Sequence, residues 1–425
     1  MTDAGAASRS RAGKRARGPA ARSDGARQDG ALKDGPLNDG ALNDGALKDG
    51  PRRDGVRDDG IRQRGPREDG LRDDRPREDL PGAAPVTLQD VADRAGVSLT
   101  TASRVVSDGP RRVGRNLVSR VNQAVAELGY TANLQARAVA TGQSNMVGVV
   151  VHDIADPYFS SIAAGLIDVA HSRRLLVGLS STVGEESERE YVALMRAQRA
   201  RAVILVGSRS GDQAALADLR TEIEAFTSGG GRAACVGQDL LGIDTILPEN
   251  AAGARALGRA LVVQGHRNFA VLAGPRGLLT AEHRLAGFLD GLAEWSVSVD
   301  KSYVIHGAFT RDGGYEAMST VLAMGGPRPE CVFAVNDVMA VGALARLRAE
   351  GIGVPGEVGL AGFDDISTVR DVYPPLTTVR LPLARMGEMA ARLVLTDASP
   401  GRPRVIPVPG EVILRDSTAR LPSRR

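Results

Sequence analysis

Polar and aromatic side chains follow three predicted strands in the body of the chain, and these side chains could bind a small molecule. Residues 156–159 (Asp-Pro-Tyr-Phe) follow the first of these strands, residues 336–337 (Asn-Asp) follow another, and residues 363–365 (Phe-Asp-Asp) follow the last. In open parallel sheets, ligands bind beyond the carboxyl ends of the strands. Carboxylates and amides there can grip hydroxyl groups, while aromatic faces cover an apolar side of the ligand. The pattern favours a small polar ligand.

Catalysis has no comparable set of residues. The five histidines never pair at a metal-ligand spacing, and neither a P-loop nor a G-x-S-x-G nucleophile elbow occurs. Residues 351–356 satisfy G-x-G-x-x-G, but a dinucleotide site needs a strand before the glycines and a helix after them. Here a predicted helix precedes the glycines and a predicted strand follows, so we interpret the segment as a turn. We expect no catalytic residue, no metal site and no cofactor.

Short Val/Leu/Ile runs alternate with amphipathic stretches from Met146 onward, and these elements must position the polar residues. The predicted strands are Met146–Val151, Leu175–Ser181, Ala202–Gly207, Ala233–Gly237, Phe269–Gly274, Val332–Val335 and Val358–Gly362. The predicted helices include Phe159–His171, Asn250–Gln264, Ala281–Glu294 and Asp337–Glu350. Such alternation makes parallel sheets covered on both faces. About 280 residues favour two such lobes over one, so the fold class is α/β.

A second motif precedes this body, at residues 86–130. Thr87 is a good N-cap, and apolar residues then recur at helical spacing until Gly96, which suits the end of a helix. Ser98 can cap a second helix from Leu99 to about Ser107, and a third is predicted at Val113–Leu128. Two helices joined by a glycine-containing turn are typical of a helix-turn-helix. A small helical bundle that binds no nucleic acid would have the same pattern.

The second helix has two distinct faces. Its inward residues are Ala102, Val105 and Val106, and its outer residues are Leu99, Thr100, Thr101, Ser103 and Arg104. A polar outer face is what a helix that reads a DNA groove requires. The order Thr-Leu-x-Asp-Val-Ala-x-x-Ala-Gly-Val-Ser, followed by Ser-Arg-Val, closely resembles the DNA-binding headpiece of the LacI/GalR family of transcriptional regulators. The resemblance implies contacts to double-stranded operator DNA from Thr87, Ser98 and these outer residues.

The segment 132–145 is the hinge by the same resemblance. In the family it folds on DNA and inserts a leucine wedge into the minor groove. Asn133 and Arg137 match the family pattern, whereas Val139 stands at the wedge position. A smaller β-branched side chain is a less capable wedge. A plain linker is the alternative interpretation of this segment.

The body, residues 146–425, resembles the family's two-lobed core, which is shared with periplasmic sugar-binding proteins. The resemblance implies effector contacts from Arg284, Phe309, Asn336 and Asp364, which join Tyr158 and Phe159 from the strand pattern. It also implies crossings between the lobes near Leu240–Pro248, Pro375–Thr378 and Arg402–Pro407. The residue set does not choose between a sugar and a purine-like ligand.

The first 85 residues are predicted to be a disordered tail. From Ser23 to Gly82 a five-residue pattern of the form x-Asp-Gly-x-Arg/Leu repeats, and this period matches neither a helix nor a strand. Ordering such a chain would cost more entropy than burial returns. Charge is uneven in the rest of the chain: residues 86–142 carry a net +3, and the remainder carries a net −2. A basic head on a near-neutral body fits a protein that contacts phosphates at one end.

These features together predict a transcriptional regulator whose operator affinity is switched by a small ligand bound between the lobes. We expect the regulator to be a repressor. Two headpieces must occupy two half-sites, so we expect a homodimer or higher assembly. The sequence has no signal-peptide core and no apolar run near the roughly 20 residues that span a bilayer. We therefore expect a cytoplasmic protein with no membrane partner. The alternative is a periplasmic-type sugar-binding receptor for transport, which the headpiece and the missing signal peptide disfavour.

Overall fold

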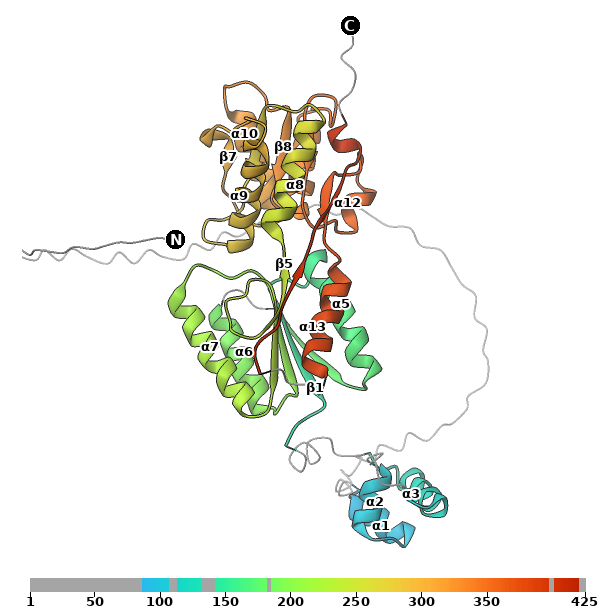
Figure 1. Ribbon diagram of the computed structural model, residues 1–425. Coiled ribbons are helices and arrows are strands. Elements are labelled where there is room, and N and C mark those ends of the chain that lie inside the picture. The colour runs from blue at the N-terminus through green and yellow to red at the C-terminus, as the bar shows by residue number, and fades with distance from the viewer. Residues whose placement is uncertain (1–85, 107–112, 132–141, 182–184, 397–400, 420–425) are drawn as a thin grey trace, which may run out of the picture. The chain divides into compact units, whose positions relative to one another are not determined.

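The computed structural model describes residues 86–106, 113–131, 142–181, 185–396 and 401–419. Figure 1 shows these residues as a three-helix headpiece and a body with two parallel sheets. The predicted tail, the hinge residues Asn133, Arg137 and Val139, and Ser107 at the predicted end of the second helix lie outside the described residues.

Three short helices form the headpiece: α1 (Leu88–Ala95), α2 (Leu99–Val106) and α3 (Arg115–Leu128). The Thr87 hydroxyl accepts a hydrogen bond from the Asp90 amide at 3.3 Å, and the Asp90 carboxylate accepts one from the Thr87 amide at 2.8 Å. This reciprocal cap fixes the start of α1. The predicted start of the third helix at Val113 was wrong by two residues. Gly114 takes the cap position instead, with its carbonyl accepting from the Leu117 and Val118 amides of α3.

The headpiece core is small and apolar. Val91 and Ala95 of α1 pack against Val121 and Ala124 of α3. Ala102 of α2 is fully buried, and its neighbours Val105 and Val106 are half-buried against the same cluster, as predicted. The Arg120 guanidinium also donates to the Ala95 carbonyl at 2.5 Å, which ties α3 to the end of α1. Packing of this kind stabilises helices too short to persist alone in water.

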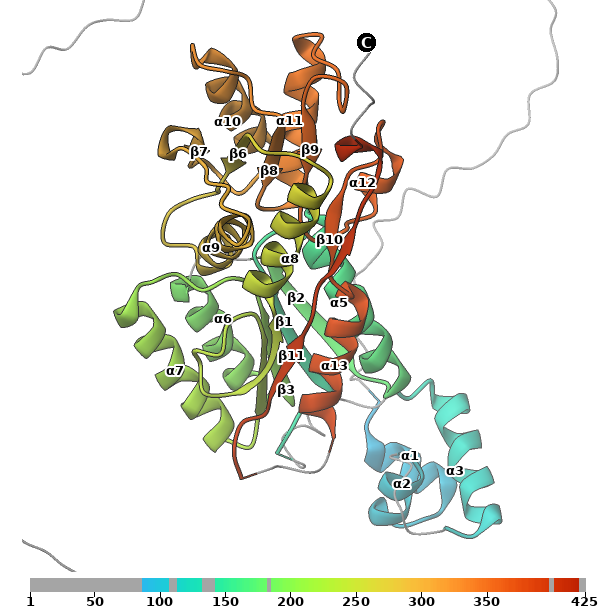
Figure 2. The same ribbon diagram turned by 45° about the horizontal axis from the view of Figure 1, so that its top comes forward.

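The first lobe contains a six-stranded sheet in which all strands are parallel. Their order is β11-β5-β4-β3-β1-β2. The strands are β1 (Met146–Val151), β2 (Leu176–Ser181), β3 (Ala202–Val206), β4 (Arg232–Val236), β5 (Asp244–Pro248) and β11 (Val405–Val408). Helices α5 (Pro157–Ser172) and α13 (Leu383–Leu395) pack together on one face, and α6 (Glu185–Ala197) and α7 (Gln213–Ser228) on the other (Figures 1 and 2).

The side chains of β1 alternate between the two faces of the sheet, and helices cover both faces. Val147 and Val149 belong to the hydrophobic core that includes α5, whereas Val150 belongs to the core that includes α6 and α7. Successive side chains of a strand point to opposite faces, so a continuous valine run supplies both cores. This confirms the predicted parallel sheet with helices on both faces.

The second lobe contains a four-stranded parallel sheet in the order β7-β6-β8-β9. The strands are β6 (Phe269–Leu272), β7 (Val304–Ile305), β8 (Cys331–Ala334) and β9 (Gly359–Ala361). Helix α8 (Asn250–Val263) packs on α9 (Leu279–Ala293), and α10 (Arg311–Ala323) packs on α11 (Asp337–Ala349). The short elements are η1 (Lys301–Tyr303), α12 (Thr368–Asp371) and η2 (Asp416–Thr418).

The chain passes between the lobes three times. The first passage follows β5, where Pro248 ends the first-lobe strand and Asn250 begins α8, as predicted. The other two passages lie a few residues later than predicted. The second follows β10 (Thr378–Arg380), and the third lies between β11 of the first sheet and β12 (Glu411–Ile413). Strands β10 and β12 pair antiparallel with each other. Strands β5, β7, β10, β11 and β12 were missing from the sequence prediction.

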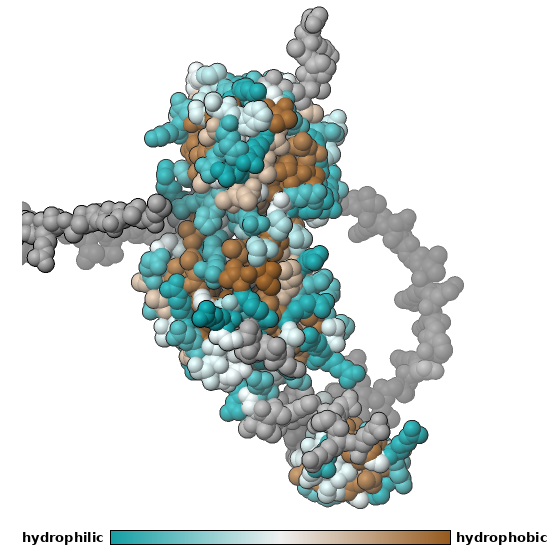
Figure 3. All heavy atoms as spheres, viewed as in Figure 1, coloured by the Kyte–Doolittle hydropathy of each residue, from teal (hydrophilic) through white to brown (hydrophobic). Residues whose placement is uncertain are grey.

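Hydrophilic residues cover most of the visible surface of the body (Figure 3). Hydrophobic residues gather in that view on the first lobe, close to the position of β5 in Figure 1. Among the described helices, none is both long and apolar enough to cross a membrane.

Candidate functional site

The outer face of α2 presents the residues predicted to contact DNA. Leu99, Thr100 and Arg104 are exposed, and Leu99 retains 46% of its accessible surface despite being apolar. Thr101 and Ser103 are half-buried. An exposed leucine beside polar residues and a guanidinium suits contact with base edges and methyl groups in a groove.

Two of the predicted DNA-contacting hydroxyls also hold the helix ends. The Ser98 hydroxyl accepts from the Thr101 amide at 3.2 Å and shares a hydrogen bond with the Thr101 hydroxyl at 2.9 Å. The Thr87 hydroxyl donates to the Asp90 carboxylate at 2.7 Å, and the backbone bond from Thr87 lowers the pKa of Asp90. These side chains are therefore pre-oriented at the amino ends of α1 and α2, where helix amides favour a nearby phosphate.

A cavity lies at the carboxyl ends of the strands, with residues from both lobes around it. All six residues predicted to bind a ligand line it: Tyr158, Phe159, Arg284, Phe309, Asn336 and Asp364. The elements that position them are far apart in the sequence. Tyr158 and Phe159 begin α5, Arg284 lies on α9, Phe309 precedes α10, Asn336 caps α11, and Asp364 follows β9.

Arg284 and Asp364 form the centre of this cavity. The guanidinium donates two bonds to the Asp364 carboxylate, at 2.7 and 3.1 Å. It also donates to the Asn250 amide oxygen at 2.8 Å and to the Val335 carbonyl at 2.9 Å. Its carbon lies 4.0 Å from the centre of the Phe363 ring. Four of the five guanidinium hydrogens are thus used by the protein, which holds the side chain in one orientation.

The electrostatics of the cavity depend on burial. Burial acts to raise the pKa of Asp364 and the Asp337 carboxylate adds to this effect, whereas the Arg284 guanidinium acts to lower this pKa. The two-pronged geometry of the pair indicates an ionised carboxylate facing a guanidinium. Burial also raises the pKa of Asp156. The backbone of Asp364 has φ of 120°, a value that residues with a side chain rarely adopt.

The amide and the rings occupy the remaining walls. Asn336 accepts from the Met339 amide at 2.9 Å as the cap of α11, and its own amide group donates to the Phe309 carbonyl at 3.4 Å. The Tyr158 and Phe159 rings meet edge to face with centroids 5.0 Å apart. An amide with a spare donor hydrogen and a paired set of rings can bind a polar ligand that also has an apolar face.

Comparison with known proteins identifies the architecture. The sequence pattern of bacterial regulatory proteins, lacI family, matches residues 87–133, and that of a periplasmic binding protein-like domain matches residues 259–418. The chain is 34% identical over 312 residues to the HTH-type transcriptional regulator GalR of Escherichia coli, covering 73% of this chain and 88% of that protein. It is 31% identical over 342 residues to the HTH-type transcriptional repressor CytR of Escherichia coli, covering 79% and 97%.

The chain belongs to the lacI family. Solved structures agree: a lac repressor dimer bound to operator and the anti-inducer ONPF has a TM-score of 0.66 at 28% identity, covering 79% of this chain and 99% of that one. A complex of the transcriptional regulator CelR with cellobiose has a TM-score of 0.57 at 27% identity, covering 78% and 99%. This lacI-family chain is therefore a DNA-binding transcriptional regulator and not an enzyme. The transport-receptor alternative is not favoured, because the headpiece and its relatives are those of regulators.

Sequence reasoning missed several residues that line the cavity of this lacI-family chain. His152 and Ser208 follow the carboxyl ends of β1 and β3, and this position was the signal that could have found them. Asp156 was placed at a strand end but not assigned to the site. Leu278 and Thr280, at the start of α9, had no such signal because they come from a loop after a glycine turn.

The missed residues also connect the two lobes. The Ser208 hydroxyl accepts from the Thr280 amide at 3.0 Å, and the Gln238 amide group donates to the Thr280 hydroxyl at 2.9 Å. Ser210 and Leu278 form an antiparallel bridge beside them. Beneath this contact Arg209 and Glu188 form a fully buried ion pair. The cavity is therefore closed along one side by hydrogen bonds between lobes.

Proposed function

We propose that this regulator is a repressor that binds operator DNA through the outer face of α2 and a neutral, polar small molecule in the cavity between its lobes. The observation that carries the proposal is the convergence of Arg284, Asp364, Asn336 and the aromatic rings from separate elements in one cavity. The lac repressor and CelR structures support it, since one holds operator DNA and an anti-inducer and the other holds cellobiose.

The charge of the cavity favours a neutral ligand. The Arg284 charge is balanced by Asp364 at 2.7 Å, and Asp156 adds a further carboxyl group to the wall. An anionic ligand would have to displace Asp364 from the guanidinium and would then face two carboxyl groups, which is costly at low dielectric. Hydroxyl and amide groups would instead donate to these oxygens. A sugar or a nucleoside-like metabolite has this chemistry.

The switch requires two headpieces on two half-sites, so the regulator acts as a homodimer or a higher assembly in the cytoplasm. A ligand changes operator affinity if the lobes can adopt two arrangements and the ligand binds these with different affinity. Linkage of this kind is typically worth about 1–3 kcal/mol, or about 5- to 150-fold in affinity. The hydrogen bonds at Thr280 join the lobes beside the cavity, so a ligand there would act directly on their spacing.

One experiment tests both halves of the proposal. Operator sequences are selected from random DNA with the full chain, and sugars and nucleosides are then titrated into the protein and into its operator complex. Arg104→Ala should weaken operator binding by about 10-fold or more, since a base-reading guanidinium contributes about 1–3 kcal/mol. Effector affinity should not change in this variant, because Arg104 lies in the headpiece.

Asp364→Asn tests the cavity while keeping an acceptor for Arg284. It should weaken effector binding by about 10-fold, because a hydrogen bond to a charged group contributes about 1.5–3 kcal/mol. The matched control is Asp244→Asn, which alters another Arg–Asp pair away from the cavity. Failure to select any operator would refute the DNA half. An unchanged effector affinity in Asp364→Asn would show that the ligand binds elsewhere.

A further inference from the structure

Arginines gather at the amino edge of the first sheet, where its strands begin. Parallel strands all start at the same edge, so residues just before β1, β3, β4 and β11 lie together there with the carboxyl ends of α5, α6 and α13. Backbone bonds join this edge: Ser144 donates to the Arg199 carbonyl at 2.8 Å, and Arg232 donates to the Arg201 carbonyl at 3.1 Å. The arginines are Arg173, Arg199, Arg201, Arg232, Arg402 and Arg404.

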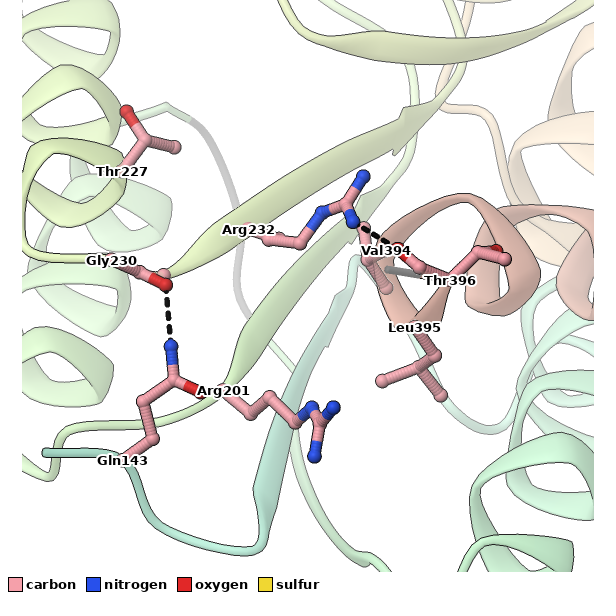
Figure 4. Close-up of a pocket in the computed structure, with 9 residues that line it drawn as sticks. Gln143, Arg201, Thr227, Gly230, Arg232, Val394, Leu395 and Thr396 are labelled. Carbon is pink, nitrogen blue, oxygen red and sulfur yellow. Dashed lines mark hydrogen bonds between the residues drawn. The ribbon is translucent and has the colours of Figure 1, made fainter. Parts of the chain in front are cut away.

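Three of these side chains have a structural task. Arg173 donates to the Leu395 carbonyl, and Arg232 donates to the Thr396 carbonyl (Figure 4). Arg404 donates to the Leu393 carbonyl at 3.0 Å and forms an ion pair with Asp244 at 2.5 Å. The last carbonyls of α13 carry the negative end of the helix dipole, and cations there stabilise the helix.

Arg199 and Arg201 have no such task. Within the described residues, neither side chain forms a hydrogen bond or an ion pair. Figure 4 shows the Arg201 guanidinium in a pocket with Gln143 and Arg232, without a bond to the residues drawn. Two acidic residues of the first lobe, Asp244 and Glu222, are paired with Arg404 and with Arg196. Among the described residues of this edge, the charges of Arg199 and Arg201 are therefore not balanced by an ion pair, and like charges repel one another without stabilising the fold.

The chain connects this edge directly to the headpiece. Gln143 lines two pockets of the edge and Gly142 lines one of them, and β1 begins three residues after Gln143. Ten residues, 132–141, separate Gly142 from Thr131, so the two positions can never be farther apart than roughly 40 Å at about 3.6 Å per residue. A headpiece on its operator thus keeps the start of the body within roughly 40 Å of the headpiece. The DNA there carries one charge per about 1.7 Å of helix axis.

We propose that the amino edge of the first sheet, through Arg199 and Arg201, binds the phosphate backbone of the operator DNA. This rests on the proposed function and adds a second, sequence-independent DNA contact in the core. Phosphate contacts position a protein on the duplex and carry no sequence information. The core edge would therefore raise the affinity for every DNA sequence equally, and α2 would supply the discrimination.

The salt dependence of operator binding tests this inference. The double variant R199Q/R201Q is compared with the parent on the selected operator and on random DNA of equal length between 50 and 200 mM KCl. For each phosphate that the variant no longer neutralises, the slope of log K against log salt should decrease in magnitude by about 0.9. Raising KCl from 50 to 200 mM should then reduce the affinity of the variant by a factor about 3.5-fold smaller than the factor for the parent. At 50 mM KCl the variant should bind both DNAs several-fold more weakly than the parent, by a similar factor.

The matched control is R311Q/R328Q, which removes two exposed, ion-paired arginines of the second lobe. Its slope should equal that of the parent. If R199Q/R201Q has the same slope as this control, the inference is wrong, although operator selection and the Arg104→Ala result would still stand. If the variant loses affinity for the operator but not for random DNA, the edge does not act as a phosphate contact. Failure of the parent to select an operator would instead overturn the proposed function.

Discussion

The ligand cavity and the amino edge of the first sheet both contain an Arg–Asp pair, but the two pairs differ in how far their side chains are exposed to solvent. The Arg284 and Asp364 side chains are 1% and 6% exposed, whereas those of Arg404 and Asp244 are 33% and 11% exposed. Burial raises the pKa of Asp364 despite its guanidinium partner. Burial also acts to raise the pKa of Asp244, but the hydrogen bonds from Arg404 outweigh it and hold that pKa low.

The two pairs differ in the free energy that their burial costs. Removing charges from water costs free energy that a buried pair regains only with good geometry and further hydrogen bonds. Arg284 obtains these from Asn250 and Val335, so the fold accepts a costly pair at the cavity. At the amino edge the pair stays partly hydrated and joins the start of β5 to the residue before β11, and Arg404 also donates to the Leu393 carbonyl of α13. The costly pair lies where a ligand would bind.

The largest expected effect separates the two pairs by stability. Arg284→Met leaves the Asp364 carboxylate buried without its partner and should lower the free energy of unfolding by about 3–5 kcal/mol. Arg404→Met should cost about 1 kcal/mol, because its partner can be hydrated. Urea unfolding of both variants measures the difference. Equal losses would contradict the distinction between the pairs.

A double variant sharpens this test. Arg284→Met with Asp364→Leu replaces the buried pair by apolar side chains of similar size, which is often neutral or stabilising. It should recover much of the stability lost in Arg284→Met. Effector binding should remain lost, because neither the Arg284 guanidinium nor the Asp364 carboxylate remains in the cavity. Recovery of both properties would show that the pair is structural only.

The sequence predicted the position of the cavity and six of its lining residues, but it did not predict the lining residues that come from the contact between the lobes. Strand ends in a parallel sheet meet at one edge, so residues 156–159 and 363–365 could be grouped from their positions after predicted strands. The family resemblance added Arg284 and Phe309, which have no local signal. Thr280 and Leu278 could not be predicted, because their role depends on contact between loops of two lobes that are distant in the chain.

The amino edge shows the opposite limitation. Arg199 and Arg201 lie just before a predicted strand, where isolated arginines usually mark a solvated surface. Their grouping with Arg402 depends on β11 pairing beside β5, and that strand was absent from the prediction. A four-residue strand with a central proline has too weak a pattern to be recognised, and tertiary pairing decides its structure.

A smaller effect is expected at the hydrogen bonds between the lobes. Thr280→Val keeps the side-chain shape but removes the hydroxyl that accepts from the buried Gln238 amide group at 2.9 Å. An unsatisfied buried donor costs about 1–3 kcal/mol, so the free energy of unfolding should fall by about 1–2 kcal/mol. The matched control is Thr320→Val on the exposed side of α10, which should change stability by less than about 0.5 kcal/mol. Equal values for the two variants would mean that the contact between the lobes does not persist in solution.

The smallest effect is a pH dependence at the amino edge. Because Arg404 holds the pKa of Asp244 below its usual value, the pair contributes stability above the unfolded-state pKa of about 3.9 and loses it as pH falls through the folded-state value. Arg404→Gln should therefore lower the free energy of unfolding by about 1 kcal/mol at pH 7. The difference in the free energy of unfolding between Arg404→Gln and the parent, measured by urea unfolding, should be smaller at pH 3 than at pH 7. Arg311→Gln, whose partner Asp312 is exposed, should show no gap at either pH. A gap that stays constant or widens in acid would mean that hydration, and not Arg404, sets the ionisation of Asp244.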